Sequence, residues 1–86
     1  MSAQSKLIFN LKNVSEPKVI TVGKSYFFIN DLEIKPSDWS KIKNILDETL
    51  AEDNFIMITF YHDDTYGTNK FIVRTSEIIS IETVGF

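Results

Sequence analysis

The single histidine of the chain lies beside two aspartates, in the stretch YHDDTYGTN at positions 61–69. Histidine and carboxylates can bind a metal ion or transfer protons in catalysis. A structural zinc site needs four ligands, and His62 has no second histidine to pair with. An EF-hand loop spaces its acidic residues two apart, whereas Asp63 and Asp64 are adjacent. Because Gly67 and its polar neighbours are typical of turns, we predict a hairpin loop here, without metal or catalytic function.

Other patterns that would indicate an enzyme are incomplete. Gly23, Lys24 and Ser25 match the end of a phosphate-binding loop, but Lys18 occupies the position of the first glycine that the pattern requires. An apolar segment typical of a strand follows, where the loop needs a helix whose amides hold phosphate. The chain has no cysteine and no Gly-x-Ser-x-Gly sequence. We therefore expect a protein that is not an enzyme and that has no cofactor.

Charge is distributed unevenly along the chain. Residues 1–43 carry seven lysines and four acidic residues, a net +3, while residues 44–86 carry two basic and eight acidic residues, a net −6. The total is −3. Such asymmetry can mark a charged interaction surface, or two halves that neutralise each other on folding.

Four of these eight acidic residues fall at or just beyond the C-terminal end of a predicted helix, whose lysines, Lys41 and Lys43, lie nearer its start. This order opposes the helix dipole, by about 0.3–1 kcal/mol for each misplaced terminal charge. Either lysines of the strands neutralise the acids within the fold, or the acids face a basic partner. We predict a protein-interaction module of the second kind, with partner-binding residues Asp47, Glu48, Glu52, Asp53, Asp63 and Asp64.

Two alternatives remain open. In the first, the apolar C-terminal strand makes the chain a self-associating structural subunit, with Phe86 free to dock on a neighbouring copy. In the second, aromatic residues stack on nucleic-acid bases while basic residues contact phosphates. The net negative charge makes nucleic acid the less favoured partner, because phosphate contacts dominate such affinity. The nucleic-acid-binding residues would be Lys12, Lys18, Lys24, Tyr26, Phe28 and Arg74.

The segment IVRTSEII at 72–79 is similar to the second motif of Sm-like proteins. An apolar pair precedes Arg74, an isoleucine follows at the matching distance, and Thr75 replaces the glycine of the motif. The resemblance implies that Arg74 contacts RNA. The first Sm motif is absent and the predicted helix lies mid-chain, so we do not assign the chain to that family. The alternative is a strand–bend–strand corner in which Arg74 pairs with Glu77 or Glu82.

The elements that must position these residues follow from the apolar pattern. Alternation in KLIFNLK predicts a first strand, and β-branched or aromatic runs predict two more. Ser37 is a predicted N-cap after Pro36, and Trp39 begins an apolar stripe at helical spacing that anchors the helix to the sheet. The segment FIMITFY is apolar on both faces and predicts a central strand. The predicted strands are 6–12, 18–22, 25–30, 55–61, 70–74 and 77–84, with a helix at 37–52 and a connection at 31–36.

The predicted fold is therefore α+β, in the order β-β-β-α-β-β-β. We expect an antiparallel sheet or small barrel with one amphipathic helix packed on it, in a single domain spanning residues 1–86. A hydrophobic fraction of 43% and a charged fraction of 24% are ordinary for a globular protein. We find no targeting or membrane-spanning pattern and expect a cytoplasmic protein. Eight lysines to one arginine indicate AT-rich coding DNA, which is compatible with a phage or mobile-element gene.

Overall fold

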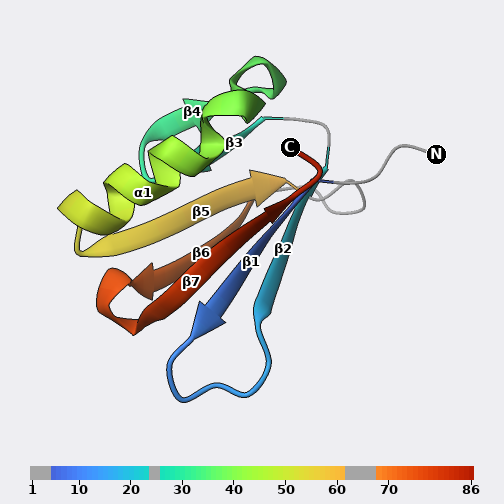
Figure 1. Ribbon diagram of the computed structural model, residues 1–86. Helices are drawn as coiled ribbons and strands as arrows, with labels where there is room; N and C mark the ends of the chain where they lie inside the picture. Colours follow the sequence, from blue (N-terminus) through green and yellow to red (C-terminus); the bar gives the residue numbers. More distant parts are fainter. Residues whose placement is uncertain (1–4, 24–25, 62–67) are drawn as a thin grey trace.

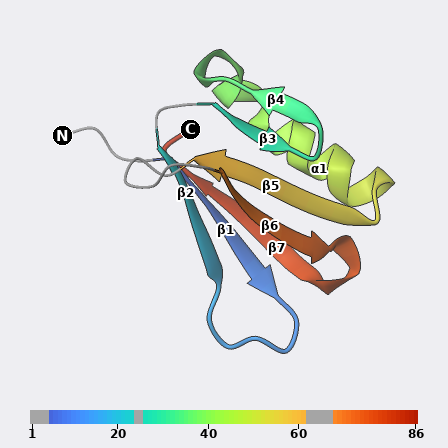
Figure 2. The same ribbon diagram turned by 180° about the vertical axis from the view of Figure 1, so that it is seen from behind.

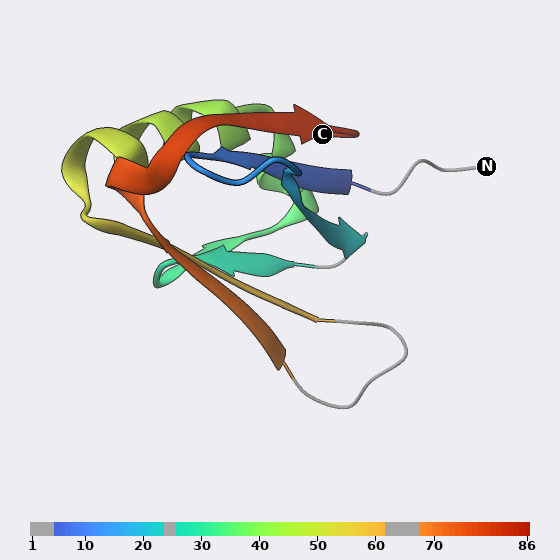
Figure 3. The same ribbon diagram turned by 90° about the horizontal axis from the view of Figure 1, so that it is seen from below.

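The computed structural model of the chain describes residues 5–23, 26–61 and 68–86. Within them, seven strands form two antiparallel sheets, and one helical segment packs beside the sheets (Figure 1). The predicted α+β class is confirmed. Seen from below, β1 and β7 lie in one layer and β5 and β6 in another (Figure 3).

The first sheet has the strand order β2-β1-β7. Its strands are β1 (Ser5–Leu11), β2 (Lys18–Gly23) and β7 (Ile78–Val84). Leu7 and Phe9 of β1 are fully buried, which confirms the inward face that the alternating pattern predicts.

The second sheet has the order β4-β3-β5-β6. Its strands are β3 (Phe27–Ile29), β4 (Leu32–Ile34), β5 (Phe55–Tyr61) and β6 (Thr68–Arg74). Since β5 is paired on both sides, the prediction of a central strand at 55–61 is confirmed. Ile56 and Ile58 point into the core and are fully buried.

The strand β4 corrects the expectation that residues 31–36 only connect a strand to the helix. Ile29 pairs with Leu32, so Asn30 and Asp31 form a two-residue hairpin connection. Asn30 has a φ of 54°, in the left-handed region that asparagine tolerates better than most residues. This turn returns the chain along β3 and places Ile34 in the core.

The helical segment begins differently from the prediction. A 3₁₀ helix, η1 (Pro36–Lys41), precedes the α-helix α1 (Ile42–Glu52). Proline holds Lys35 extended, and the Lys35 N–H donates to the Asp38 carboxylate over 3.1 Å. The prediction that Ser37 caps the helix is therefore wrong: the first turn starts at the proline, and Asp38 takes the capping role. No helix in the described residues is long and apolar enough to cross a membrane.

The core lies between the two sheets and the helical segment. The Phe9 ring of β1 contacts the Phe71 ring of β6, with centroids 5.1 Å apart. Trp39 lies against Phe27 and Phe86 at 5.8 and 5.0 Å, where the sequence predicts the anchor of the helix. The buried apolar residues are Leu7, Phe9, Ile20, Val22, Phe27, Ile29, Ile34, Ile42, Leu46, Ile56 and Ile58.

The helix α1 lies beside β7, on the side away from β1, and runs in the opposite direction to β7 (Figures 1 and 2). A short 3₁₀ turn, η2 (Thr75–Glu77), carries the chain from β6 of one sheet to β7 of the other. The antiparallel arrangement of α1 and β7 places residues 43–50 of the helix beside residues 79–83 of the strand.

Candidate functional site

The acidic residues of α1 lie on its solvent-facing side. The buried face consists of Ile42, Leu46 and Thr49, and Ile45 and Leu50 beside it are partly buried against the core. Asp47 falls on the flank that faces β7. Glu48 and Glu52, one turn apart, fall on the opposite flank, as helical periodicity requires.

These three acids are not neutralised within the described part of the chain. Asp47, Glu48 and Glu52 are exposed, and none of them forms an ion pair or side-chain hydrogen bond with another described residue. Of the two explanations that the sequence leaves open, neutralisation by strand lysines is not observed among residues 5–23, 26–61 and 68–86. The like charges of Glu48 and Glu52 therefore remain unfavourable in the isolated chain.

Asp53 has a different environment from the acids of α1. Its carboxylate accepts a hydrogen bond of 3.0 Å from the Asn30 side chain, and its backbone carbonyl accepts one of 2.9 Å from the Thr75 hydroxyl. Its N–H donates to the Thr49 carbonyl at the end of α1. Asp53 therefore ties the end of α1 to the β3–β4 turn and to η2, and its carboxylate is less available to a partner.

Asn30 is a structural residue that the sequence analysis does not identify. Its N–H donates to the Met57 carbonyl over 2.7 Å, and its side-chain oxygen accepts from the Met57 N–H over 2.8 Å. Its side-chain nitrogen also reaches the Phe55 carbonyl at 3.3 Å. One signal was present, since Asn30 precedes an aspartate between two apolar segments, a combination typical of tight turns.

The remaining predicted partner-binding residues, Asp63 and Asp64, lie outside the described residues, together with His62. The same holds for Lys24 of the nucleic-acid alternative. The structure therefore gives no position for these four side chains.

The two aromatic residues of the nucleic-acid alternative lie together. Tyr26 and Phe28 make an edge-to-face contact with centroids 5.9 Å apart, and Tyr26 also contacts Tyr61 of β5 at 5.2 Å. Phe28 pairs across the sheet with Glu33, which places an acid beside these rings. This cluster therefore offers aromatic faces next to a negative charge.

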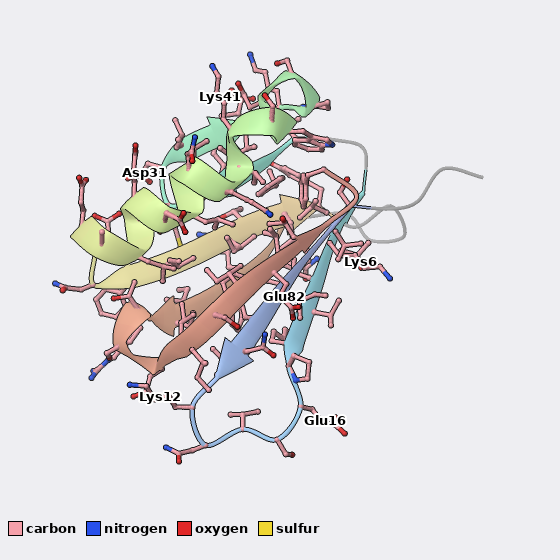
Figure 4. All side chains as sticks on the ribbon, in the orientation of Figure 1. Lys6, Lys12, Glu16, Asp31, Lys41 and Glu82 are labelled. Carbon is pink, nitrogen blue, oxygen red and sulfur yellow. The ribbon has the colours of Figure 1, made fainter. Side chains whose placement is uncertain are left out.

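The basic residues of that alternative lie elsewhere. Arg74 pairs with Phe55, at the opposite end of the β5–β6 ladder from Tyr61. Lys12 follows β1, and Lys18 begins β2, in the other sheet; the Lys18 ammonium lies 5.9 Å from the Phe71 ring. Figure 4 shows Lys12 beside the β1–β2 loop, far from α1. The fold brings the aromatic residues together, but Lys12, Lys18 and Arg74, the described cations that would contact phosphates, lie elsewhere.

A hydrogen bond with Tyr26 changes the acid–base properties of Tyr61. The bond to Tyr26 raises the pKa of Tyr61 above its ordinary value, and desolvation and the negative charge of Glu33 act in the same direction. Tyr61 is therefore protonated at neutral pH and is not an activated nucleophile or base.

The corner between β6 and β7 agrees with the strand–bend–strand alternative, because the short 3₁₀ turn η2 lies where the sequence predicts the bend. The ion pairs suggested for it do not form between described residues: Arg74 has no acidic partner, and Glu82 accepts a hydrogen bond of 3.1 Å from Asn10. Thr75, the residue that replaces the motif's glycine, donates its hydroxyl and its N–H to Asp53 and Asn54. Thr75 thus has a structural role in this chain.

Phe86, the residue of the self-association alternative, is half-buried within its own chain. Its ring contacts Trp39 at 5.0 Å and Phe27 at 6.2 Å. Docking of Phe86 on a neighbouring copy would compete with these contacts.

A groove between α1 and β7 is a feature that sequence reasoning misses. It has a volume of about 370 Å³. Ile79, at its rim, is 66% exposed, a high value for so large an apolar side chain. Its lining residues are Lys43, Leu46, Asp47, Leu50, Ile79, Ser80, Ile81 and Thr83.

The chain matches no protein-family model, and no curated protein or solved structure matches it. In the described residues, no group of three or more histidine, cysteine, aspartate or glutamate side chains is placed to hold a metal ion. The site is therefore defined by geometry alone: a small two-sheet α+β domain with an acidic helix beside an open groove.

Proposed function

We propose that this protein is a non-catalytic protein-interaction module that binds a basic surface of a partner through acidic residues of α1. One observation carries the proposal: Asp47, Glu48 and Glu52 project from the helix without an ion pair to any described residue. Asp53 is set apart from this group by its hydrogen bonds to Asn30 and Thr75.

The energetics of α1 support this proposal. Acidic residues near the C-terminus of a helix are unfavourable by about 0.3–1 kcal/mol each, and a like-charged pair one turn apart adds to that effect. The last turn of α1 contains no basic residue that would offset it. A basic partner would relieve both effects on binding, and opposite charges would also accelerate association.

The experiment is affinity capture with the purified chain as bait. We compare the wild type with the double variant Glu48→Lys, Glu52→Lys, using mass spectrometry to quantify captured proteins at two salt concentrations. Because both side chains are exposed and unpaired in the described structure, the variant should fold normally. Captured partner should fall by about tenfold or more, the equivalent of about 1.4 kcal/mol.

A matched control separates a local effect from a change in overall charge. The double variant Glu16→Lys, Glu77→Lys reverses two exposed acids and changes the net charge equally. Glu16 lies in the β1–β2 loop, far from α1 (Figure 4). Capture should persist in this control, and equal capture by all three proteins would exclude α1 as the binding surface.

A further inference from the structure

The four sheet edges of this fold differ in how they are protected against strand addition. Exposed edge strands are usually blunted by lysine, proline, short length or a cover. The β2 edge begins with Pro17 and Lys18, β4 has only three residues, and β6 carries Lys70 and Arg74. The seven residues of β7 (Ile78–Val84) contain no lysine, arginine or proline.

The unprotected edge of β7 borders the groove beside α1. Among the described strands, β7 pairs with β1 alone. In an antiparallel ladder, alternate residues direct their N–H and C=O groups away from the paired strand, so the outer edge of β7 presents such groups beside α1. Leu46 and Leu50 of α1 line one side of the groove, and Ile79 and Ile81 line the other.

We propose that an extended segment of the partner, with apolar and basic residues in alternation, adds as a strand to the free edge of β7 within this groove. This inference rests on the proposed function and specifies the form of the partner. Main-chain hydrogen bonds to β7 would supply affinity, and apolar side chains would contact Leu46, Leu50 and Ile79. The rim carries two charged residues, Lys43 and Asp47, and basic side chains of the segment would face Asp47. Glu48 and Glu52, on the opposite flank of α1, would add to the negative potential.

Charge and shape both favour a partner segment over a second copy of the chain. A second copy that paired through its own β7 would bring its own α1 to the same place, because that helix flanks β7. The acidic residues of the two helices would then approach each other and repel. A basic extended segment carries no flanking helix, and its charge is opposite to that of the acidic residues of α1.

The test uses short synthetic peptides in which valine, isoleucine or leucine alternates with lysine, labelled with fluorescein. Binding is measured by fluorescence anisotropy, and the binding position by backbone amide shifts and hydrogen exchange of the isotope-labelled protein. A second set of peptides carries N-methyl groups on alternate amides, which removes strand hydrogen bonds and keeps the charges. Three protein variants are compared: Ile79→Lys on the β7 edge, Val19→Lys on the β2 edge, and the double variant Glu48→Lys, Glu52→Lys.

We expect peptides to bind the wild type and to protect amides of β7 from exchange. Ile79→Lys should weaken binding by about tenfold or more, and Val19→Lys should leave it within about twofold. N-methylated peptides should lose most of their affinity.

Three outcomes would overturn the inference. If N-methylated peptides bind equally well and only the Glu48→Lys, Glu52→Lys variant loses binding, strand addition is wrong while the proposed function stands. If no peptide binds at millimolar concentration, the edge has no affinity for such segments. If light scattering shows a dimer that Ile79→Lys dissociates, the occupant is a second copy.

Discussion

The two edges of the β2-β1-β7 sheet flank the same central strand and have opposite environments. On the β2 side, Lys18 lies 5.9 Å from the Phe71 ring of β6, and Phe71 in turn contacts Phe9. We call this the closed flank, because strands of both sheets meet there. On the β7 side, the open flank, α1 lies alongside and leaves a groove.

If the proposed function is correct, packing and binding occupy different sides of one small sheet. In a chain of 86 residues, most large apolar side chains are needed for the core. On the closed flank, Ile20 and Val22 of β2 are buried, while on the open flank Ile79 of β7 is 66% exposed. A residue that contributes little to the core can be changed or covered by a partner with little effect on folding.

The largest effect on stability should follow from removing an aromatic contact of the closed flank. Phe71→Ala removes the ring contact with Phe9 and the surface on which Lys18 lies. Because Phe71 is half-buried, we expect a loss of about 3 kcal/mol in the free energy of unfolding, at the lower end for such substitutions. Urea denaturation followed by circular dichroism measures this loss. A change below about 1 kcal/mol would mean that the two sheets are not joined by this contact.

An intermediate effect should follow from releasing the end of α1. Asn30→Ala removes the side-chain hydrogen bonds to Met57, Phe55 and Asp53 and also disfavours the φ of 54°. We expect destabilisation by about 1–3 kcal/mol. Asn30→Gly keeps the backbone conformation accessible and isolates the hydrogen bonds, so it should recover part of the loss. Equal stability of wild type and Asn30→Ala would show that Asn30 does not hold the open flank in place.

A smaller effect, with the opposite sign, should follow from reversing the two acids on the side of α1 that faces away from β7. Glu48→Lys with Glu52→Lys replaces one like-charge pair by another, and it places cations near the C-terminus of α1, where the helix dipole favours them. We expect stabilisation by about 0.5–1 kcal/mol at low salt, decreasing as salt screens the charges. Urea midpoints at two salt concentrations measure it. Destabilisation would indicate that these acids have partners within the chain after all.

The sequence predicts individual strands and helices better than it predicts which of them pair or pack together. Alternation in β1 and the two-faced apolar run of β5 identify both strands, because each pattern depends on the strand itself. β4 was missed because its three residues form a strand only through the turn at Asn30, which Met57 and Asp53 stabilise from distant positions. The start of the helical segment was misplaced because Pro36 moves the first turn ahead of Ser37.

The same contrast between local features and features that depend on several elements applies to the candidate site. The acids of α1 were identifiable because their order opposes the helix dipole within one element. The groove was not identifiable, because it depends on β7 pairing with β1 and on α1 lying beside β7. Strand patterns alone admit several sheet orders, and the observed order places Ile79 and Leu50 in the same groove.

The smallest effect should follow from placing a lysine on either edge. Ile79→Lys and Val19→Lys alter side chains that are 66% and 47% exposed, so each should change the free energy of unfolding by no more than about 0.5 kcal/mol. The new lysine at position 79 lies near Asp47, which offsets part of the lost apolar contact. Urea titration of both variants beside the wild type gives the comparison. If Ile79→Lys alone destabilised the protein by more than about 1 kcal/mol, Ile79 would be part of the core. The open flank would then be as structural as the closed one, and the contrast between the two edges would fail.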